Sequence, residues 1–417
     1  MSLTIVASGF LRATSSIRVT LRIIRTSLFI FLSYLIIGVL LAALPSYVHL
    51  HLGFSTFWAG IAVSSQYAAT VLSRPRAGRM TDVLGPRTTV LLGQIACFLS
   101  GLLLLLAVTL EDRVIVCFGV LLMSRVALGS GESGVATGSA TWGLGRLKSE
   151  YAAQVISWSG IASYGGMAVG APLGVWLDNT YGMKGIGTAV TGISFLNFTL
   201  ALPLAGVPIL RGEHLPFQKV LHEVFIDGLG LALGTIGFCT IASFTTLYYA
   251  SLHWTAPALA MSLFGVCFIA TRLTFADTIN RWGGLRVAMV SFLVEATGLL
   301  VLWSATSPDM ARAGAALSGC GFALVFPALG VEAIKGVAES DRGSALGVYG
   351  AFLDLAMAVT GPLAGLIIGK WGYASIFLYG SAAAVCAFVL IFSRARFESS
   401  RSGGHSDIRI GLQRLTK

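Results

Sequence analysis

The segment Arg125–Gly134, with the sequence RVALGSGESG, places Arg125 and Glu132 inside an apolar run that begins near Val114. A charge at the centre of a lipid bilayer costs about 2.5–3.5 kcal/mol on insertion scales, so it should face protein or water. The two residues are seven apart, which places them on one helix face, about two turns from each other. That separation is too long for a simple ion pair, so each side chain is expected to meet a third group or a wet cavity.

The same segment allows two other interpretations. Residues 129–134 fit G-x-G-x-x-G, the pattern of dinucleotide-binding loops. No strand-like segment precedes it and the surrounding sequence is as apolar as a bilayer span, which argues against a nucleotide site. A structural ion pair that only ties helices together remains an alternative to a role in transport for Arg125 and Glu132.

The composition is that of a polytopic membrane protein. The 417 residues are 55% hydrophobic and 11% charged, with a mean hydropathy of +0.82, whereas soluble proteins carry about 25% charged residues. Fifty glycines suit close helix packing in lipid. The six cysteines all fall in apolar spans and are expected to act as small hydrophobic residues rather than disulfides or metal ligands: Cys97, Cys117, Cys239, Cys267, Cys320 and Cys386.

Windows of about 20 apolar residues predict twelve transmembrane helices. They cover roughly 27–47, 56–76, 88–110, 114–140, 151–177, 184–208, 223–249, 256–276, 285–305, 310–335, 343–369 and 373–394. The first is longer than the apolar core of a signal peptide, so it is expected to stay uncleaved. The prediction is an all-α membrane protein.

An internal repeat divides these spans into two halves. Gly160 and Pro172 recur 190 residues later as Gly350 and Pro362, and the loop GRMTDVLGPR at 78–87 has a counterpart, ADTINRWGGLR, at 276–286. We therefore expect two pseudo-symmetric six-helix bundles, which is typical of alternating-access transporters. The expected segments are a basic leader 1–26, bundles 27–210 and 223–394, a central linker 211–222 and a basic tail 395–417.

The basic residues predict the orientation in the membrane. Twenty-three of the 28 Lys and Arg residues fall in segments that are cytoplasmic if both termini are inside, and four fall outside. This bias follows the positive-inside rule, so we expect cytoplasmic N and C termini. It also accounts for the net charge of +10, so no nucleic-acid partner is expected.

Three motifs resemble the major facilitator superfamily (MFS), and the resemblance covers essentially the whole chain. The loop at 78–87 is similar to the signature between its second and third helices, with Val83 where a basic residue is common. RVALGSG at 125–131 is similar to the fourth-helix signature of proton-coupled members. GMAVGAPLG at 166–174 resembles the antiporter signature loosely, because Ala171 replaces a glycine. The run 129–145 resembles the arabinose-efflux-permease-like bacterial subgroup (YhhS/YfcJ type).

The resemblance implies that spans one, four, seven and ten line a cavity. On that basis Arg125, Glu132 and Asp354 are the expected proton-coupling residues, and the proton gradient replaces any cofactor. Glu332 and Lys335 are three apart and are expected to form a local pair near the cytoplasmic rim. Two further acids are left open: Asp227 could extend to the membrane interface or favour the start of its helix, and Glu295 could be a helix-packing contact or have a function.

The resemblance also implies a cytoplasmic gate. Gly78 should let the end of span two cross a neighbour closely, and Asp82 should meet the backbone N–H groups at the start of span eleven, near 342–345. A merely solvated loop is the alternative. The expected gate residues are Gly78, Asp82, Gly85, Arg87 and Asn280.

Polar and aromatic residues of these spans are candidates for the cavity wall, although for any one of them packing or anchoring at the interface is the more frequent role. They are Tyr34, Gln66, Tyr67, Trp142, Trp158, Tyr164, Tyr248, Phe326 and Tyr349. As a set they suggest an amphipathic organic solute.

The prediction is a monomeric secondary transporter of the bacterial inner membrane, not an enzyme. It is expected to work as a proton-coupled antiporter that exports a small organic solute (a sugar, drug or metabolite), with the solute, protons and the lipid bilayer as partners. An uptake symporter or facilitator on the same fold is the alternative. A membrane-embedded enzyme or receptor is disfavoured, because no Walker loop, metal-ligand spacing or sizeable soluble domain is visible.

Overall fold

The computed structural model describes residues 2–147, 152–207, 217–337 and 342–415, and within these ranges the chain forms helices and no strands. Of the predicted central linker, 211–222, the first half (211–216) lies outside the described residues, and 217–222 form the start of a helix rather than a linker. The chain divides into two compact units, which are described separately below.

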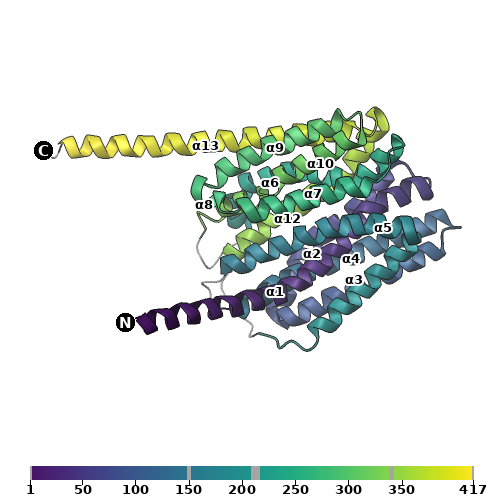
Figure 1. Ribbon diagram of the computed structural model, residues 1–417, viewed down its shortest axis with the longest axis horizontal. Coiled ribbons are helices and arrows are strands. Elements are labelled where there is room, and N and C mark those ends of the chain that lie inside the picture. The colour runs from purple at the N-terminus through teal and green to yellow at the C-terminus, as the bar shows by residue number, and fades with distance from the viewer. Residues whose placement is uncertain (1, 148–151, 208–216, 338–341, 416–417) are drawn as a thin grey trace. The chain divides into compact units, whose positions relative to one another are not determined.

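The first half of the chain contains the six predicted spans (Figure 1). Its helices are α1 (Ser2–Ser46), α2 (Thr56–Leu84), α3 (Pro86–Thr109), α4 (Val114–Gly145) and α5 (Ala152–Ala201), with a π-helical turn, η1 (Tyr47–His51), after α1. Two predicted spans run together in α5. They are separated at Gly182, whose φ of 62° and ψ of −164° break the helical geometry.

The second half also contains six spans. Its helices are α6 (Phe217–Ser251), α7 (Pro257–Phe275), α8 (Thr278–Trp282), α9 (Gly284–Trp303), α10 (Pro308–Phe322), α11 (Val325–Ala333), α12 (Arg342–Trp371) and α13 (Ser375–Leu415). The predicted span 310–335 is formed by α10 and α11 together. Pro327 explains the break between them, because proline has no N–H to bond the carbonyl of Ala323, four residues earlier.

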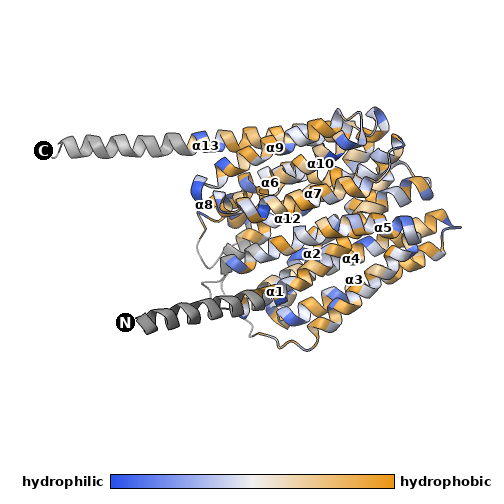
Figure 2. Ribbon diagram, viewed as in Figure 1, coloured by the Kyte–Doolittle hydropathy of each residue, from blue (hydrophilic) through white to orange (hydrophobic). Residues whose placement is uncertain are grey.

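Most helices have the length and apolarity of membrane spans. Nine stretches in the described residues are long and apolar enough to cross a membrane, and the orange ribbon in Figure 2 shows that hydrophobic residues occupy much of their length. The helices α2 and α5 are not among the nine. The first half of α2 is less apolar because it carries Ser64, Ser65, Gln66 and Thr70, and these residues make the hydrogen bonds described below.

The compact units differ from the predicted division into 27–210 and 223–394. The first unit comprises Met1–Glu213 together with Cys239–Val266 and Met357–Ile376; the second comprises His214–Phe238, Cys267–Ala356 and Phe377–Lys417. Contacts inside the first unit explain the difference. Thr246 on α6 donates to the carbonyl of Ala42 at 3.2 Å, and Thr56 donates to the carbonyl of Gly365 on α12 at 2.8 Å. These segments of α6, α7 and α12 therefore pack with helices of the first half.

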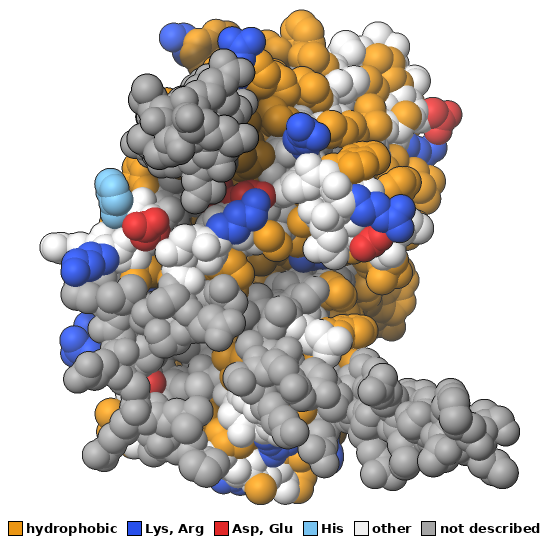
Figure 3. Space-filling view, turned by 90° about the vertical axis from the view of Figure 1, so that its left-hand side faces the viewer, with side chains coloured by type: hydrophobic (Ala, Val, Ile, Leu, Met, Phe, Trp, Pro, Cys, Tyr) orange, Lys and Arg blue, Asp and Glu red, His pale blue; other side chains and the backbone are white. Residues whose placement is uncertain are grey.

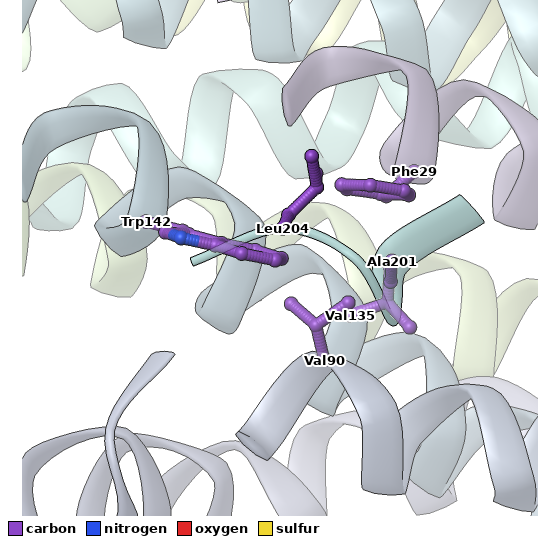
Figure 4. Packing of buried hydrophobic residues seen from close by; sticks show 6 residues of the cluster. All are labelled: Phe29, Val90, Val135, Trp142, Ala201 and Leu204. Carbon is purple, nitrogen blue, oxygen red and sulfur yellow. The ribbon is translucent and has the colours of Figure 1, made fainter. Parts of the chain in front are cut away.

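A buried apolar cluster fills the first unit between α1, α3, α4 and the end of α5 (Figure 4). Trp142 is fully buried there and stacks on Phe29, with 5.7 Å between ring centroids. Its indole N–H donates to the carbonyl of Ala205 at 3.1 Å. Trp142 was predicted to line a cavity, but this environment gives it a packing role.

The loop repeat is visible in the backbone. Gly85 has φ 87° and ψ 155°, and Gly283 has φ 83° and ψ 152°. Each is followed directly by the first residue of a helix, Pro86 in α3 and Gly284 in α9. Residues that carry a side chain rarely adopt a positive φ, so both turns favour glycine. The predicted correspondence between the two loops is therefore seen in their geometry.

Candidate functional site

Small residues bring α4 into backbone contact with α2 and α3. A Cβ atom added at Gly129 would lie 2.1 Å from the carbonyl oxygen of Gln66, and one added at Gly131 would lie 2.6 Å from that of Gly93. No larger residue fits without moving a helix. The side chains of α4 near these glycines therefore face protein, as expected for charged residues within a membrane span.

Glu132 is held by two donors from α2. Its side chain is buried, with 1% of the residue exposed. Oε2 accepts hydrogen bonds from Gln66 Nε2 at 3.1 Å and from Thr70 Oγ1 at 3.0 Å. The expected third group thus consists of Gln66, which was a predicted site residue, and Thr70, which was missed. Thr70 lies four residues after Gln66, so helical spacing could have indicated it.

Arg125 is equally buried, with 1% exposed. Its charge interacts electrostatically with Tyr67 on α2, Cys97 on α3 and Glu132 on its own helix. Its Nη2 atom has no hydrogen-bond partner among the described residues. A guanidinium normally uses all its donors when buried, so this arrangement is costly. Arg125, Glu132, Gln66, Thr70, Tyr67 and Cys97 are called the α4 polar cluster below.

The third predicted coupling residue belongs to the other unit. Asp354 lies on α12 and is buried, with 1% exposed. Nearby on the same helix, the Tyr349 hydroxyl donates to the carbonyl of Phe326 at 2.9 Å, and the two rings are 5.2 Å apart. These two predicted cavity residues thus pair with each other inside the second unit.

The other predicted cavity residues occupy varied environments. Tyr34 and Trp158 are half-buried, and Tyr164 is buried on α5. Tyr248 is buried at the end of α6, where its ring lies edge-on to that of Trp254, 5.6 Å away. The structure therefore brings Gln66 and Tyr67 to the charged residues of α4 and distributes the rest along the helices.

The predicted gate residues are only partly as expected. The helix α2 continues through Gly78 and Asp82 to Leu84, and nothing in the described residues lies within 4 Å of a Cβ built at Gly78. The predicted close crossing at Gly78 is therefore not seen among the described residues, and it stays a prediction. Asp82 and Asn280 are exposed. Arg87 donates to the carbonyl of Leu202 at 2.6 Å, joining α3 to the end of α5. The contact of Asp82 with the start of α12 remains a prediction.

In the second unit, Glu332 caps α9, the helix that corresponds to α3 in the repeat. Glu332 Oε1 accepts a hydrogen bond from the backbone N–H of Gly284, the first residue of α9, at 2.8 Å. Its Oε2 lies 2.5 Å from Lys335 Nζ, which confirms the predicted local pair. A carboxylate at a helix N-terminus is favoured by the helix dipole, so Glu332 has a structural role in holding α11 to α9.

Asp227 has a basic partner on another helix, a contact that the sequence did not indicate. It is fully buried on α6 and forms an ion pair with Arg394 on α13. Removing one partner of a buried pair leaves an uncompensated charge and costs about 3–5 kcal/mol. Arg394→Leu should therefore lower the thermal stability of the purified protein strongly, and Asp227→Leu combined with Arg394→Leu should recover most of the loss. Additive losses in a double-mutant cycle would show that the pair is not coupled.

A second polar group lies at the far end of α1. The Tyr47 hydroxyl donates to Glu111 Oε1 at 2.7 Å, and His51 Nε2 lies 3.2 Å from Glu111 Oε2. Burial opposes ionisation of Glu111, but the hydrogen bonds from Tyr47 and His51 outweigh it and hold the pKa of this carboxyl below its usual value. The ionised Glu111 therefore ties the η1 turn to the loop before α4 at neutral pH.

Comparison with known proteins identifies the family. The family model of the Major Facilitator Superfamily matches residues 26–271 and 228–416. The chain belongs to the major facilitator superfamily. A relative in Burkholderia mallei (strain SAVP1), named an uncharacterized MFS-type transporter, is 49% identical over 376 residues, 90% of this chain and 92% of that protein. A protein of the same description in Pseudomonas aeruginosa (strain UCBPP-PA14) is 48% identical over 385 residues, 92% and 96% of the two chains.

Solved MFS structures share the fold. The crystal structure of a D-xylose–proton symporter superposes with a TM-score of 0.73 at 15% sequence identity, over 89% of this chain and 96% of that one. At that identity the likeness shows the fold alone. The α4 polar cluster is thus part of a multi-pass MFS transporter with twelve spans in two six-helix halves.

Proposed function

We propose that this MFS transporter is a proton-coupled antiporter that exports a small organic solute by alternating access. The observation that carries the proposal is the α4 polar cluster, in which an arginine and a glutamate are buried within a membrane span. Charged residues in that position are costly and typically belong to ion or proton pathways. Moving one proton through 100 mV releases about 2.3 kcal/mol, enough to support a solute gradient of roughly fiftyfold.

In this mechanism Glu132 binds and releases the proton. Gln66 and Thr70 donate hydrogen bonds to one carboxylate oxygen, and Arg125 provides the nearby positive charge, so the ionised form has partners in the conformation described. Protonation removes the attraction to Arg125 and weakens the contacts with α2. Asp354 is the second carrier that we propose, because it is a buried acid on a span that borders the cavity in this superfamily.

The contact between α2 and α12 within the first unit, called the seam below, is the proposed outer gate. The α2 and α12 backbones meet at Gly60 and Gly361, where an added Cβ on Gly60 would lie 2.0 Å from the carbonyl oxygen of Gly361. Thr56 and Ser64 on α2 donate to carbonyls of α12 at 2.8 and 3.4 Å. Both ends of this seam fall on the side predicted to face away from the cytoplasm, so the seam must part when the transporter opens outward.

We place the protein in the bacterial inner membrane as a monomer with both termini in the cytoplasm. The bias of Lys and Arg toward the connecting segments on one side supports this orientation. Figure 3 views the end of the helices where α8 lies and shows Lys and Arg side chains on that face. On the same side, we propose that Asp82 latches the start of α12 when the cytoplasmic side is closed.

The test uses vesicles and a matched control. An untargeted comparison of metabolites exported by deletion and overexpressing cells identifies the solute. Proton-driven transport of that solute in inside-out vesicles should then fall at least about tenfold, or 1.4 kcal/mol, with Glu132→Gln combined with Asp354→Asn. Glu332→Gln, which alters a helix cap, should keep proton coupling.

An unchanged rate in the double variant would remove the coupling assignment. Accumulation of the solute inside intact cells, rather than its export, would favour the uptake symporter instead.

A further inference from the structure

Glu295 is a second buried carboxyl, placed on α9 in the second unit. Only 1% of the residue is exposed, and neither side-chain oxygen has a hydrogen-bond partner among the described residues. Its environment differs from that of Glu132, which accepts two hydrogen bonds and lies near an arginine. An ionised carboxylate without donors or counter-charge is so costly in an apolar interior that the group normally takes up a proton.

Two glycines of α6 make space for this carboxyl. A Cβ added at Gly237 would lie 2.6 Å from Glu295 Oε1, and one added at Gly234 would lie 3.5 Å from Oε2. On the other side, a Cβ added at Gly321 of α10 would lie 2.3 Å from the backbone nitrogen of Glu295. The carboxyl therefore faces two glycines of α6, which leave room for it and offer it no charge, while the backbone at Glu295 packs against α10.

In the internal repeat, the surroundings of Glu295 correspond to part of the α4 polar cluster of the first half. A Cβ added at Gly131 of α4 would lie 2.9 Å from the backbone nitrogen of Cys97 on α3. Gly321 stands in the same relation to Glu295, so Glu295 occupies the position that Cys97 has in the first half. Each half thus carries a buried glutamate on its third or fourth span, Glu132 on α4 in the first half and Glu295 on α9 in the second.

Among the described residues, no charged group on the helices packed around Glu295 is placed to stabilise its ionised form. The charged residues nearest to Glu295 along these helices are Asp227 on α6, Arg286 on α9, Asp309 and Arg312 on α10, and Arg394 on α13. Each is about two helical turns, or roughly 10 Å, or more from the residues that contact Glu295, and Asp227 is paired with Arg394 and Arg312 with Asp309. The other titratable groups there are the thiols and phenol of Cys239, Cys320, Cys386 and Tyr379.

We propose that Glu295 is a second proton-binding site of this transporter, loaded in the conformation described here. Its proton leaves when movement of α6 or α10 admits water: the O–H bond breaks, the carboxylate keeps the electron pair and water takes the proton. The inference rests on the proposed function and deepens it, because the transporter would then move more than one proton in a cycle.

Infrared spectroscopy of the purified full chain tests proton binding directly. The wild type at neutral pH should show the carbonyl stretch of a protonated carboxyl, shifted in D₂O, and this band should be lost in Glu295→Gln. The matched control, Glu332→Gln, removes an ion-paired glutamate and should keep the band. Wild-type and Glu295→Gln spectra without a difference in this region would overturn the proposal.

Two further readouts cover other outcomes. If Glu295→Gln does not fold, the wild type can be treated with a hydrophobic carbodiimide, which reacts with protonated carboxyls. Peptide mass spectra should then show the adduct at Glu295 and not at Glu332, and absence of the Glu295 adduct would overturn the proposal.

In the vesicle assay, Glu295→Gln should lower the number of protons moved per solute molecule, and an unchanged number would refute a coupling role. If the wild type moves no protons, the proposed function fails while the infrared result still decides whether Glu295 binds one.

Discussion

Arg125→Leu should reduce proton-driven transport by about a hundredfold or more while the protein still reaches the membrane. The substitution removes the positive charge that interacts electrostatically with Glu132, and a buried charge left without compensation costs about 3–5 kcal/mol. Arg125→Lys should give an intermediate rate, because lysine keeps the charge but not the planar set of donors. The measurement is the initial transport rate in vesicles, normalised to the amount of transporter. Arg281→Leu is the control, since Arg281 is exposed and its ion pair among the described residues is with Asp277.

The double variant Arg125→Leu with Glu132→Gln separates coupling from a purely structural ion pair. Removing both charges should restore much of the thermal stability that Arg125→Leu loses, because no uncompensated charge remains. Proton-driven transport should stay low, because neither the carboxyl nor the arginine is present. Recovery of both stability and transport would show that the two residues only tie helices together.

Gly361→Leu should prevent closure of the outer gate and lower transport by about 30- to 150-fold. A side chain at this position begins with a Cβ that would lie 2.5 Å from both the carbonyl oxygen of Gly60 and the hydroxyl of Ser64. Forcing atoms into such a contact costs about 2–3 kcal/mol, which shifts the equilibrium between closed and open seams by that factor. The transport rate in vesicles reports the effect.

The reporter for the gate is Thr56→Cys. Thr56 is buried at the seam, with 7% exposed, so a membrane-impermeant maleimide should label Cys at this position slowly in the parent and faster with Gly361→Leu. The control is Gly347→Leu on the same helix, where no described atom lies within 4 Å of the added Cβ. Slow labelling in the Gly361→Leu background would show that the seam tolerates the side chain and that closure there does not limit transport.

The fold could be predicted from the sequence because the bilayer imposes one simple demand. A span needs about 20 apolar residues, and each of the twelve windows corresponds to helix in the structure. Hydropathy could not locate the break between α10 and α11, since Pro327 disrupts the backbone without making the window less apolar. It also could not show that parts of α6, α7 and α12 pack with the first half, because apolarity does not specify a partner.

The charged residues of the site and two of their partners, Gln66 and Tyr67, could be predicted, but Thr70 was missed. Arg125 and Glu132 stand out because charges in a span are rare, but Thr70 resembles any other threonine of a helix. The glycine of a family motif, Gly78, suggested close packing, but no described atom lies within 4 Å of a Cβ added there. The partner of Asp227 is far away in the sequence, and only the folded chain brings Arg394 to it.

That last contact has a consequence for how the protein is made. Asp227 enters the membrane with α6 during synthesis, and its partner Arg394 follows with α13. The C-terminal half should therefore reach its final packing only after α13 has inserted, and nascent chains that stop short of α13 should be substrates for membrane proteases.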